Sequence, residues 1–167
     1  MPEPSMAQIR RQARILALQV LYELDTTTHQ ADSAVAYRLE DQPLPADGET
    51  FLRLLVGGVL THRDRLDALI QRYAPAWPVN QIAVIDRNIL RLALFELSGS
   101  LGTPPKVAIN EAVDLAKLFG SDNSSRFVNG VLGTAVADQQ PIALTLSGRP
   151  PARLPTAAGF DADVIKD

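Results

Sequence analysis

The 12 prolines of this 167-residue chain fall in clusters, and the clusters limit where regular secondary structure can run. They lie at Pro2/Pro4, Pro43/Pro45, Pro75/Pro78, Pro104/Pro105 and from Pro141 onward. Proline removes an amide hydrogen, clashes in a helix interior and restricts the residue before it. Any long helix must therefore fit between two of these clusters.

Apolar residues within the proline-free intervals recur three or four positions apart, which is typical of amphipathic helices. This spacing predicts helices over residues 7–25, 31–41, 48–73, 80–98, 105–119 and 123–137. Strand-like alternation is missing between them. The sequence therefore predicts an all-α protein.

The dipeptide Asn129-Gly130 is typical of a hairpin turn, but the apolar residues around it keep a helical spacing, so we interpret it as helix interior. Glycine there costs about 1 kcal/mol relative to alanine. A close helix crossing at Gly130, with the Asn129 amide holding a neighbouring segment, would offset the cost. Gly57-Gly58 suggests the same explanation. The alternative is that the fold tolerates the cost.

The length allows one domain, or two small lobes that share a core. We expect a flexible N-terminus over residues 1–6, a helical domain over 7–138, and a proline-rich flexible tail over 139–167. No window carries the ~18 unbroken apolar residues of a membrane span, and the N-terminus lacks the order of a signal peptide. We therefore expect a cytoplasmic protein that does not enter a membrane.

The residues that usually carry catalysis are scarce. Cysteine is absent, and His29 and His62 are the only histidines. His62-Arg63-Asp64 imitates a kinase catalytic loop without the other kinase motifs, so a solvated helix face is the better interpretation. Phosphate-binding loops and dinucleotide fingerprints are missing. The sequence therefore predicts a protein that is not an enzyme and that uses no cofactor and no metal.

Arginines gather in the first predicted helix, although the net charge is −3. Arg10 and Arg14 are four apart and share a helix face, with Arg11 beside them. Guanidinium groups can grip phosphates bidentately. Gln19 and Tyr22 follow one and two turns later and could read or stack a base. The alternative is that the arginines only solvate a helix.

The stretch from Gly120 to Phe127 restarts a helix. We expect Gly120 to end the preceding helix in the left-handed conformation, and one of residues 121–124 to cap the next. The free amides at the restarted helix attract anions, and Arg126 adds a full charge beside them. Phe127 is either core or, if partly exposed, a base-stacking platform.

Three blocks of the chain resemble the NusB family of bacterial transcription antitermination proteins. They are ARILALQVLYELD, IDRNILRLALFEL and PPKVAINEAVDLAKLFGSDNSSRFVNGVLG, in family order over roughly residues 8–138. The resemblance implies an all-helical fold of two packed helical subdomains and no catalysis. It also implies that the chain pairs with NusE, a small-subunit ribosomal protein, binds single-stranded boxA RNA in nascent ribosomal RNA transcripts, and acts on terminating RNA polymerase.

The resemblance also implies roles for individual residues. Those expected at the RNA are Arg10, Arg11, Arg14, Gln19, Arg126 and Phe127, and those expected at the NusE surface are Tyr22 and Asp86. Asp86 has an alternative role as a helix N-cap. Two positions depart from the family pattern: Gln12 stands where a basic residue is common, and Asn123 where an acidic one is common.

Two rival functions remain open at this point. NusB-like domains also occur fused to ribosomal RNA cytosine methyltransferases, but this chain has no predicted cofactor-binding α/β domain. A homodimer could instead bury the arginine face between subunits. The RNA hypothesis depends on one further prediction, that the start of the first helix and the start of the last helix converge into one cationic and aromatic surface.

Overall fold

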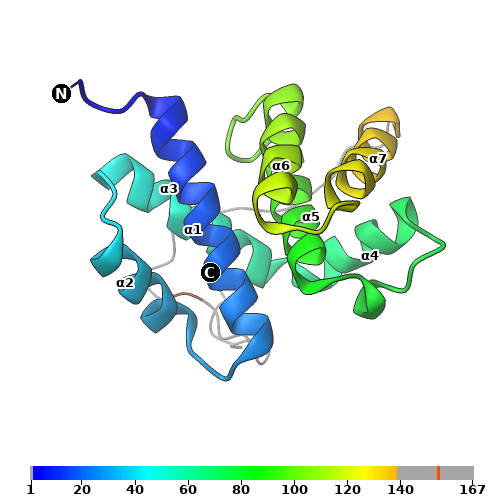
Figure 1. Ribbon diagram of the computed structural model, residues 1–167, viewed down its shortest axis with the longest axis horizontal. Coiled ribbons are helices and arrows are strands. Elements are labelled where there is room, and N and C mark those ends of the chain that lie inside the picture. The colour runs from blue at the N-terminus through cyan, green and yellow to red at the C-terminus, as the bar shows by residue number, and fades with distance from the viewer. Residues whose placement is uncertain (1, 139–153, 155–167) are drawn as a thin grey trace. The chain divides into compact units, whose positions relative to one another are not determined.

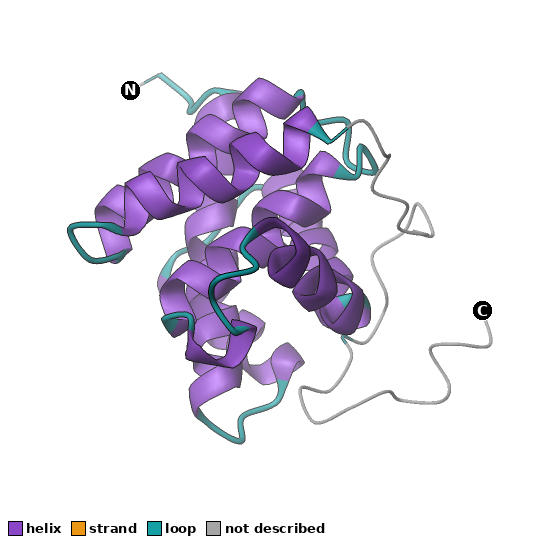
Figure 2. Ribbon diagram, turned by 90° about the vertical axis from the view of Figure 1, so that its right-hand side faces the viewer, coloured by secondary structure: helices purple, strands orange, loops and turns teal. Residues whose placement is uncertain are grey.

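The computed structural model describes residues 2–138 and Leu154, and every regular element in that part is helical. The elements in chain order are α1 (Met6–Thr26), α2 (Ala31–Asp41), α3 (Ala46–Thr61), α4 (Arg63–Tyr73), η1 (Val79–Gln81), α5 (Val84–Leu97), α6 (Pro105–Phe119) and α7 (Ser124–Ala137) (Figure 1). Figure 2 shows the same residues as helices joined by loops. The predicted all-α class is confirmed.

The chain divides into two compact helical units, the first running to Thr61 and the second beginning at His62. In the first unit α1 packs mainly on α3 and also on α2. In the second unit α5 contacts α4, α6 and α7, and α6 packs on α7. Each unit buries its apolar stripes against its own helices, as amphipathic helices require.

The first unit depends on a close approach between α1 and α3. Helix α1 starts at a capping box, in which the Ser5 hydroxyl accepts from the Gln8 amide and the Gln8 side chain accepts from the Ser5 amide. One turn on, Ile9 lies so near Gly48 that a Cβ at Gly48 would come within 2.6 Å of the Ile9 side chain. A glycine is therefore required where α3 crosses α1.

The predicted single helix over residues 48–73 is wrong, because it is two helices. Helix α3 ends at Thr61, His62 leaves the helical conformation with φ −106° and ψ 17°, and α4 begins at Arg63. Buried residues continue on both sides of the break, with Val59 before it and Leu66 after it. An apolar period reports which face is buried and does not report whether the backbone is continuous.

A buried ion pair joins α4 to α5 in the second unit. Arg91, only 5% exposed, donates from Nε and Nη2 to the two carboxylate oxygens of Asp67 at 2.7 and 2.9 Å. Its Nη1 donates to the Asn88 side chain at 3.1 Å. The pair is bidentate, so it fixes both the distance and the orientation of the two helices.

The element predicted over residues 80–98 is a short 3-10 turn, η1, followed by α5. Ala83 is the N-cap of α5, and Asp86 lies inside the first turn. The alternative role of Asp86 as an N-cap is therefore wrong. A carboxylate in the first turn still complements the helix dipole.

Two glycine predictions are wrong. Gly130 is exposed, and a Cβ added there would meet nothing within 4 Å, so no close crossing explains it. Gly120 has φ −89° and ψ −173°, which is extended and not left-handed. A side chain at Gly120 would strike Ser124 and come within 2.7 Å of the Ala116 carbonyl oxygen. The glycine is needed for space and not for its φ angle.

Gly57 and Gly58 are buried within α3, and the close approach expected at them stays a prediction. The tail predicted over residues 139–167 lies outside the described residues except for Leu154. That residue is buried, and its amide donates to the Asp32 carboxylate at 3.2 Å. Among the helices that the structure describes, none is long and apolar enough to cross a membrane.

Candidate functional site

The arginine cluster of α1 is organised by one aromatic ring of α3. The guanidinium carbon of Arg10 lies 5.0 Å from the Phe51 ring centroid, and that of Arg14 lies 5.2 Å from it. Both distances are within the range of a cation–π interaction. We call Arg10, Arg14 and Phe51 the arginine–phenylalanine cluster. It holds two positive charges one helical turn apart in a fixed arrangement.

The three arginines of α1 differ in how far they reach solvent. Arg14 is only 4% exposed and Arg10 is half-buried, whereas Arg11 is exposed. Of the cluster, Arg10 is thus the side chain better placed to meet a ligand. Arg14 adds charge beneath it and lies over the ring.

Gln19 and Tyr22 lie further along α1. Gln19 is half-buried, and its Oε1 has no hydrogen-bond partner within the described part of the protein. Tyr22 is 44% exposed, so its side chain is accessible to a partner. The Oε1 atom itself is buried, so a ligand would reach Gln19 through the exposed part of its side chain.

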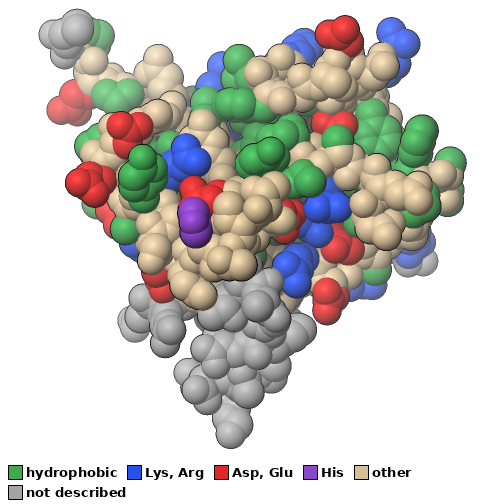
Figure 3. All heavy atoms as spheres, turned by 60° about the horizontal axis from the view of Figure 1, so that its bottom comes forward, with side chains coloured by type: hydrophobic (Ala, Val, Ile, Leu, Met, Phe, Trp, Pro, Cys, Tyr) green, Lys and Arg blue, Asp and Glu red, His purple; other side chains and the backbone are tan. Residues whose placement is uncertain are grey.

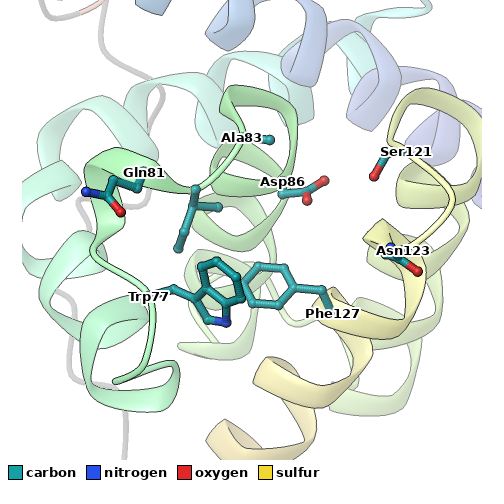
Figure 4. A pocket seen from close by; sticks show the side chains of 8 residues that line it. Trp77, Gln81, Ala83, Asp86, Ser121, Asn123 and Phe127 are labelled. Atoms are coloured by element: carbon teal, nitrogen blue, oxygen red, sulfur yellow. The ribbon is translucent and has the colours of Figure 1, made fainter.

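A pocket with a volume of about 260 Å³ opens in the second unit, between the segment before α5 and the start of α7. It is lined by Trp77, Gln81, Ile82, Ala83, Asp86, Ser121, Asn123 and Phe127. Figure 4 shows the Trp77 and Phe127 side chains pointing toward each other across the opening, with Asp86 directed into it. We call this the Asp86 pocket.

Hydrogen bonds in the loop between α6 and α7 fix one wall of the Asp86 pocket. The buried Ser124 hydroxyl accepts from the Ser121 amide at 2.8 Å and lies 3.2 Å from the Ser121 hydroxyl. Asn123 is the N-cap of α7, but its side chain makes no capping hydrogen bond. The loop is therefore held by Ser124, and the Asn123 amide lines the pocket.

Asp86 is the only charged residue among the eight that line the pocket. It is 8% exposed, and its Oδ1 has no hydrogen-bond partner among the described residues. A buried carboxylate oxygen without a donor costs free energy in the folded protein. The negative charge of Asp86 would also repel a phosphate at this pocket.

The structure brings together some of the predicted site residues and separates others. Arg10 and Arg14 both lie against the Phe51 ring, in agreement with the shared helix face that their four-residue spacing predicted. Asp86 and Phe127 line one pocket, although the sequence analysis placed them on separate faces. Arg126 is exposed and Phe127 is half-buried. The α1 residues belong to the first unit and the α7 residues to the second, so their convergence stays a prediction.

Sequence reasoning missed two aromatic residues of the site. Phe51 fits the apolar stripe of its helix, so nothing in the sequence distinguishes it from ordinary core. Trp77 carried a usable signal, because it is the only tryptophan of the chain and stands between Pro75 and Pro78. A large aromatic in a proline-bounded loop is not explained by helix packing, and Trp77 is indeed 56% exposed.

Charge on the face drawn in Figure 3 is mixed, with acidic and basic side chains interspersed among apolar ones. This agrees with a chain of 16 basic and 19 acidic residues. Any attraction for an anion must therefore come from a local group such as the arginine–phenylalanine cluster and not from overall charge.

These features define an all-helical binding protein with a cationic cluster on α1 and an aromatic, acidic pocket beside α7. The chain belongs to the NusB family, whose model matches residues 11–137. The transcription antitermination protein NusB of Roseiflexus sp. (strain RS-1) is 56% identical over 134 residues, which cover 79% of this chain and 94% of that protein. NusB of Chloroflexus aggregans (strain MD-66 / DSM 9485) is 54% identical over 78% of this chain and 89% of that protein.

Solved structures agree with the sequence relatives. T. maritima NusB superposes with a TM-score of 0.73 at 30% identity, over 84% of this chain and 95% of that one. A chain from a crystal structure of antitermination factors NusB and NusE in complex with dsRNA superposes with a TM-score of 0.71 at 26% sequence identity. The match covers 79% of this chain and 99% of that one. Membership of a family of transcription antitermination proteins confirms the expectation that the chain is not an enzyme.

Proposed function

We propose that this protein is an RNA-binding adaptor of transcription antitermination. With a NusE-type ribosomal protein it would bind boxA-like single-stranded RNA in nascent ribosomal RNA transcripts and modulate termination by RNA polymerase in the cytoplasm. The observation that carries the proposal is the likeness to the chain in the NusB, NusE and dsRNA complex, which spans 99% of that chain.

The arginine–phenylalanine cluster supports the phosphate-binding part of the proposal. Single-stranded RNA offers one negative charge per nucleotide, and guanidinium groups bind phosphate oxygens in a planar, bidentate way. Arg10 is half-buried over Phe51, so less conformational freedom is lost when it meets a phosphate. Arg11 adds an exposed charge on the same helix.

The start of α7 supplies the second group of proposed RNA contacts. Arg126 is exposed in the first turn of that helix, where free backbone amides also attract anions. Phe127 is half-buried and opens onto the Asp86 pocket, so one face of its ring can stack a base. Gln19, which is half-buried on α1, would contact a base, and Tyr22 and Asp86 would meet the NusE-type protein.

Binding should be tested with a labelled boxA-type RNA and the NusE-type protein across a range of salt concentrations. On a single strand, log affinity falls against log salt by about 0.7 for each neutralised phosphate. Arg10→Ala and Arg126→Ala should each weaken binding several-fold and reduce that slope by about 0.7. Arg65→Ala is the matched control, because Arg65 is an exposed arginine of α4 outside the proposed contacts.

The assigned surface is wrong if Arg10→Ala, Arg14→Ala and Arg126→Ala all bind RNA as Arg65→Ala does. Arg14 is buried, so the unfolding free energy of Arg14→Ala must be measured alongside. The competing hypothesis of a homodimer that masks the arginines predicts a dimer that dissociates on adding RNA. Light scattering with and without the RNA distinguishes the two.

A further inference from the structure

Leu154 is the one residue after Asp138 that the structure describes, and it belongs to the first unit. Its side chain is buried, with only 3% of the residue exposed. Its backbone amide donates to both carboxylate oxygens of Asp32, at 3.3 Å to Oδ1 and 3.2 Å to Oδ2. The residue is therefore held in two ways, by burial of an apolar side chain and by a hydrogen bond to a charged acceptor.

The sequence around Leu154 explains why its amide needs an acceptor from another part of the chain. Pro150, Pro151 and Pro155 surround it, and proline interrupts both helices and the interior strands of a sheet. Pro155 also disfavours the helical conformation for Leu154, which directly precedes it. An amide that is taken out of water without a helix or strand partner costs free energy, and the Asp32 carboxylate removes that cost.

Asp32 lies in the first turn of α2, where an acidic side chain complements the helix dipole. The dipole explains the charge at this position, but it does not explain why the Leu154 amide lies against both oxygens. Arg53 of α3 joins a second helix to the same carboxylate, with its Nη1 3.6 Å from Oδ1. The Asp32 side chain is 41% exposed, so a segment of chain that approaches from solvent can reach it.

We infer that the start of α2 is a docking site for an extended segment that contains a leucine, and that the C-terminal region of the same chain fills it through Leu154. We call the contact between Leu154 and Asp32 the Leu154 anchor. This region lies beyond residue 137, where the match to the family model ends, so the family assignment gives it no role. The anchor makes it a structural part of the first unit.

The first unit gains from such an anchor because it is small. Its helices α1, α2 and α3 all come from the residues up to Thr61, and a single apolar core is marginal at that length. A further leucine buried in the unit enlarges that core. The same unit carries the arginine–phenylalanine cluster, so the anchor stabilises the helices that hold those arginines.

The leucine of the same chain is favoured over that of a second copy. Asp138 belongs to the second unit and Leu154 to the first, and the residues between them can span about 50 Å when extended. A flexible linker of this kind gives its end an effective concentration in about the millimolar range. A second copy at ordinary protein concentration would compete from a much lower value.

Trypsin tests the Leu154 anchor directly in the full-length protein, because the Arg153–Leu154 peptide bond contains the amide that donates to Asp32. Arg149 precedes a proline and resists trypsin, so this bond is the first one after Asp138 that trypsin can cut. The cleavage rate of a free peptide of residues 147–160, divided by the rate in the protein, gives a protection factor. We expect a factor of about ten or more, because cleavage follows the population of the undocked state.

Asp32→Ala and Leu154→Ala should both reduce the protection factor to near one, the second measured against a peptide with the same change. Asp47→Ala is the matched control, because Asp47 is an exposed aspartate in the first turn of α3 and its loss removes the same charge from a helix start. It should keep the wild-type protection factor. Wild-type cleavage at the free-peptide rate, or equal loss of protection in Asp32→Ala and Asp47→Ala, overturns the inference.

Hydrogen exchange shows whether the anchored segment supports the first unit. Amides of α2 should exchange faster in Leu154→Ala than in the wild-type protein, because local opening is easier when a buried contact is lost. Amides of α6, in the second unit, should exchange at the wild-type rate. Unchanged exchange in α2 would show that Leu154 makes only an incidental contact, and the inference would be wrong.

Protein concentration distinguishes the two sources of the leucine. Protection by the same chain should be equal at low and at high protein concentration. Protection that rises with concentration, together with a dimer in light scattering, assigns the site to a second copy and overturns the inference. None of these measurements contains RNA, so the Leu154 anchor and the proposed function succeed or fail independently.

Discussion

The two units of this protein use aromatic rings in opposite electrostatic settings. In the first unit, the Phe51 ring lies under the guanidinium groups of Arg10 and Arg14. In the second unit, Trp77 and Phe127 line the same pocket as Asp86, whose buried Oδ1 has no hydrogen-bond partner among the described residues. A ring under a cation interacts favourably with its positive charge, whereas the rings of the second unit share their pocket with a buried carboxylate.

The units also differ in what holds them together. The second unit contains the buried, bidentate Arg91–Asp67 pair, and the first has the partly exposed Arg53–Glu49 pair at 3.4 Å within α3. Buried pairs are costly to break because one charge is left without a partner, whereas exposed pairs contribute little. We therefore expect the largest change in unfolding free energy when the buried Arg91–Asp67 pair is broken.

Asp67→Asn should lower the unfolding free energy by about 2–3 kcal/mol, since it leaves the Arg91 charge buried. This decrease in unfolding free energy is smaller than that expected for a fully buried pair, because 29% of the Asp67 side chain is exposed. Glu49→Gln, at the surface pair, should change it by less than about 0.5 kcal/mol. Denaturant unfolding measures both, and equal effects would remove this difference between the units.

Phe51→Leu should weaken boxA-type RNA binding by about three- to tenfold, because loss of the ring face releases Arg10 and Arg14 from their arrangement. Phe95→Leu is the control in the second unit, where Phe95 is fully buried and stacks on His62 at 6.3 Å. Both changes destabilise the fold through lost burial. If both weaken RNA binding equally at matched folded fraction, Phe51 does not position the arginines.

Gly130→Ala should raise the unfolding free energy by about 0.5–1 kcal/mol, because the position is helical, exposed and open to a Cβ. Gly120→Ala should lower it, because the added methyl group would strike Ser124. Thermal unfolding of the two variants shows whether each substitution raises or lowers the unfolding free energy. A destabilising Gly130→Ala would restore the close-crossing explanation that the structure contradicts.

The smallest effect concerns Tyr73, whose hydroxyl donates to Asp138 at 3.0 Å. Burial, and then this hydrogen bond, raise the pKa of Tyr73 above its ordinary value of 10.0. The folded state therefore holds the proton more tightly, and the resulting stability is present below about pH 10 and lost as pH rises through the folded pKa. Tyr73→Phe should make the unfolding free energy fall less steeply above pH 10. An unchanged slope would show that other groups cause the alkaline loss.

Much of the fold could be predicted because apolar spacing and proline positions act locally. The helix predicted over residues 105–119 has those bounds as α6, and the helix predicted over 7–25 differs from α1 by one residue at each end. The break at His62 could not be predicted, since the buried stripe continues past it. Likewise, a glycine at position 120 was explained by a left-handed φ angle, whereas the structure shows that a larger residue there would strike the neighbouring Ser124.

For the candidate site, the sequence predicted which residues take part better than it predicted which of them lie next to one another. Residue types and the family resemblance identified Arg10, Asp86 and Phe127. They did not reveal that Phe51 underlies the arginines or that Trp77 faces Phe127, because both contacts join residues far apart in the sequence. Roles inferred from position in a helix, such as Asp86 as an N-cap, were the least secure. A shift of a few residues in the helix start changes them.

By itself the sequence determined the helical class, most helix bounds and the family, because helix period, proline and motif order are properties of the chain alone. Only the tertiary structure decided that the carboxylate of Asp86 has an oxygen without a partner and that two arginines share one ring. Burial and pairing depend on which segments meet in space, and their free energies are set by those neighbours and not by residue type.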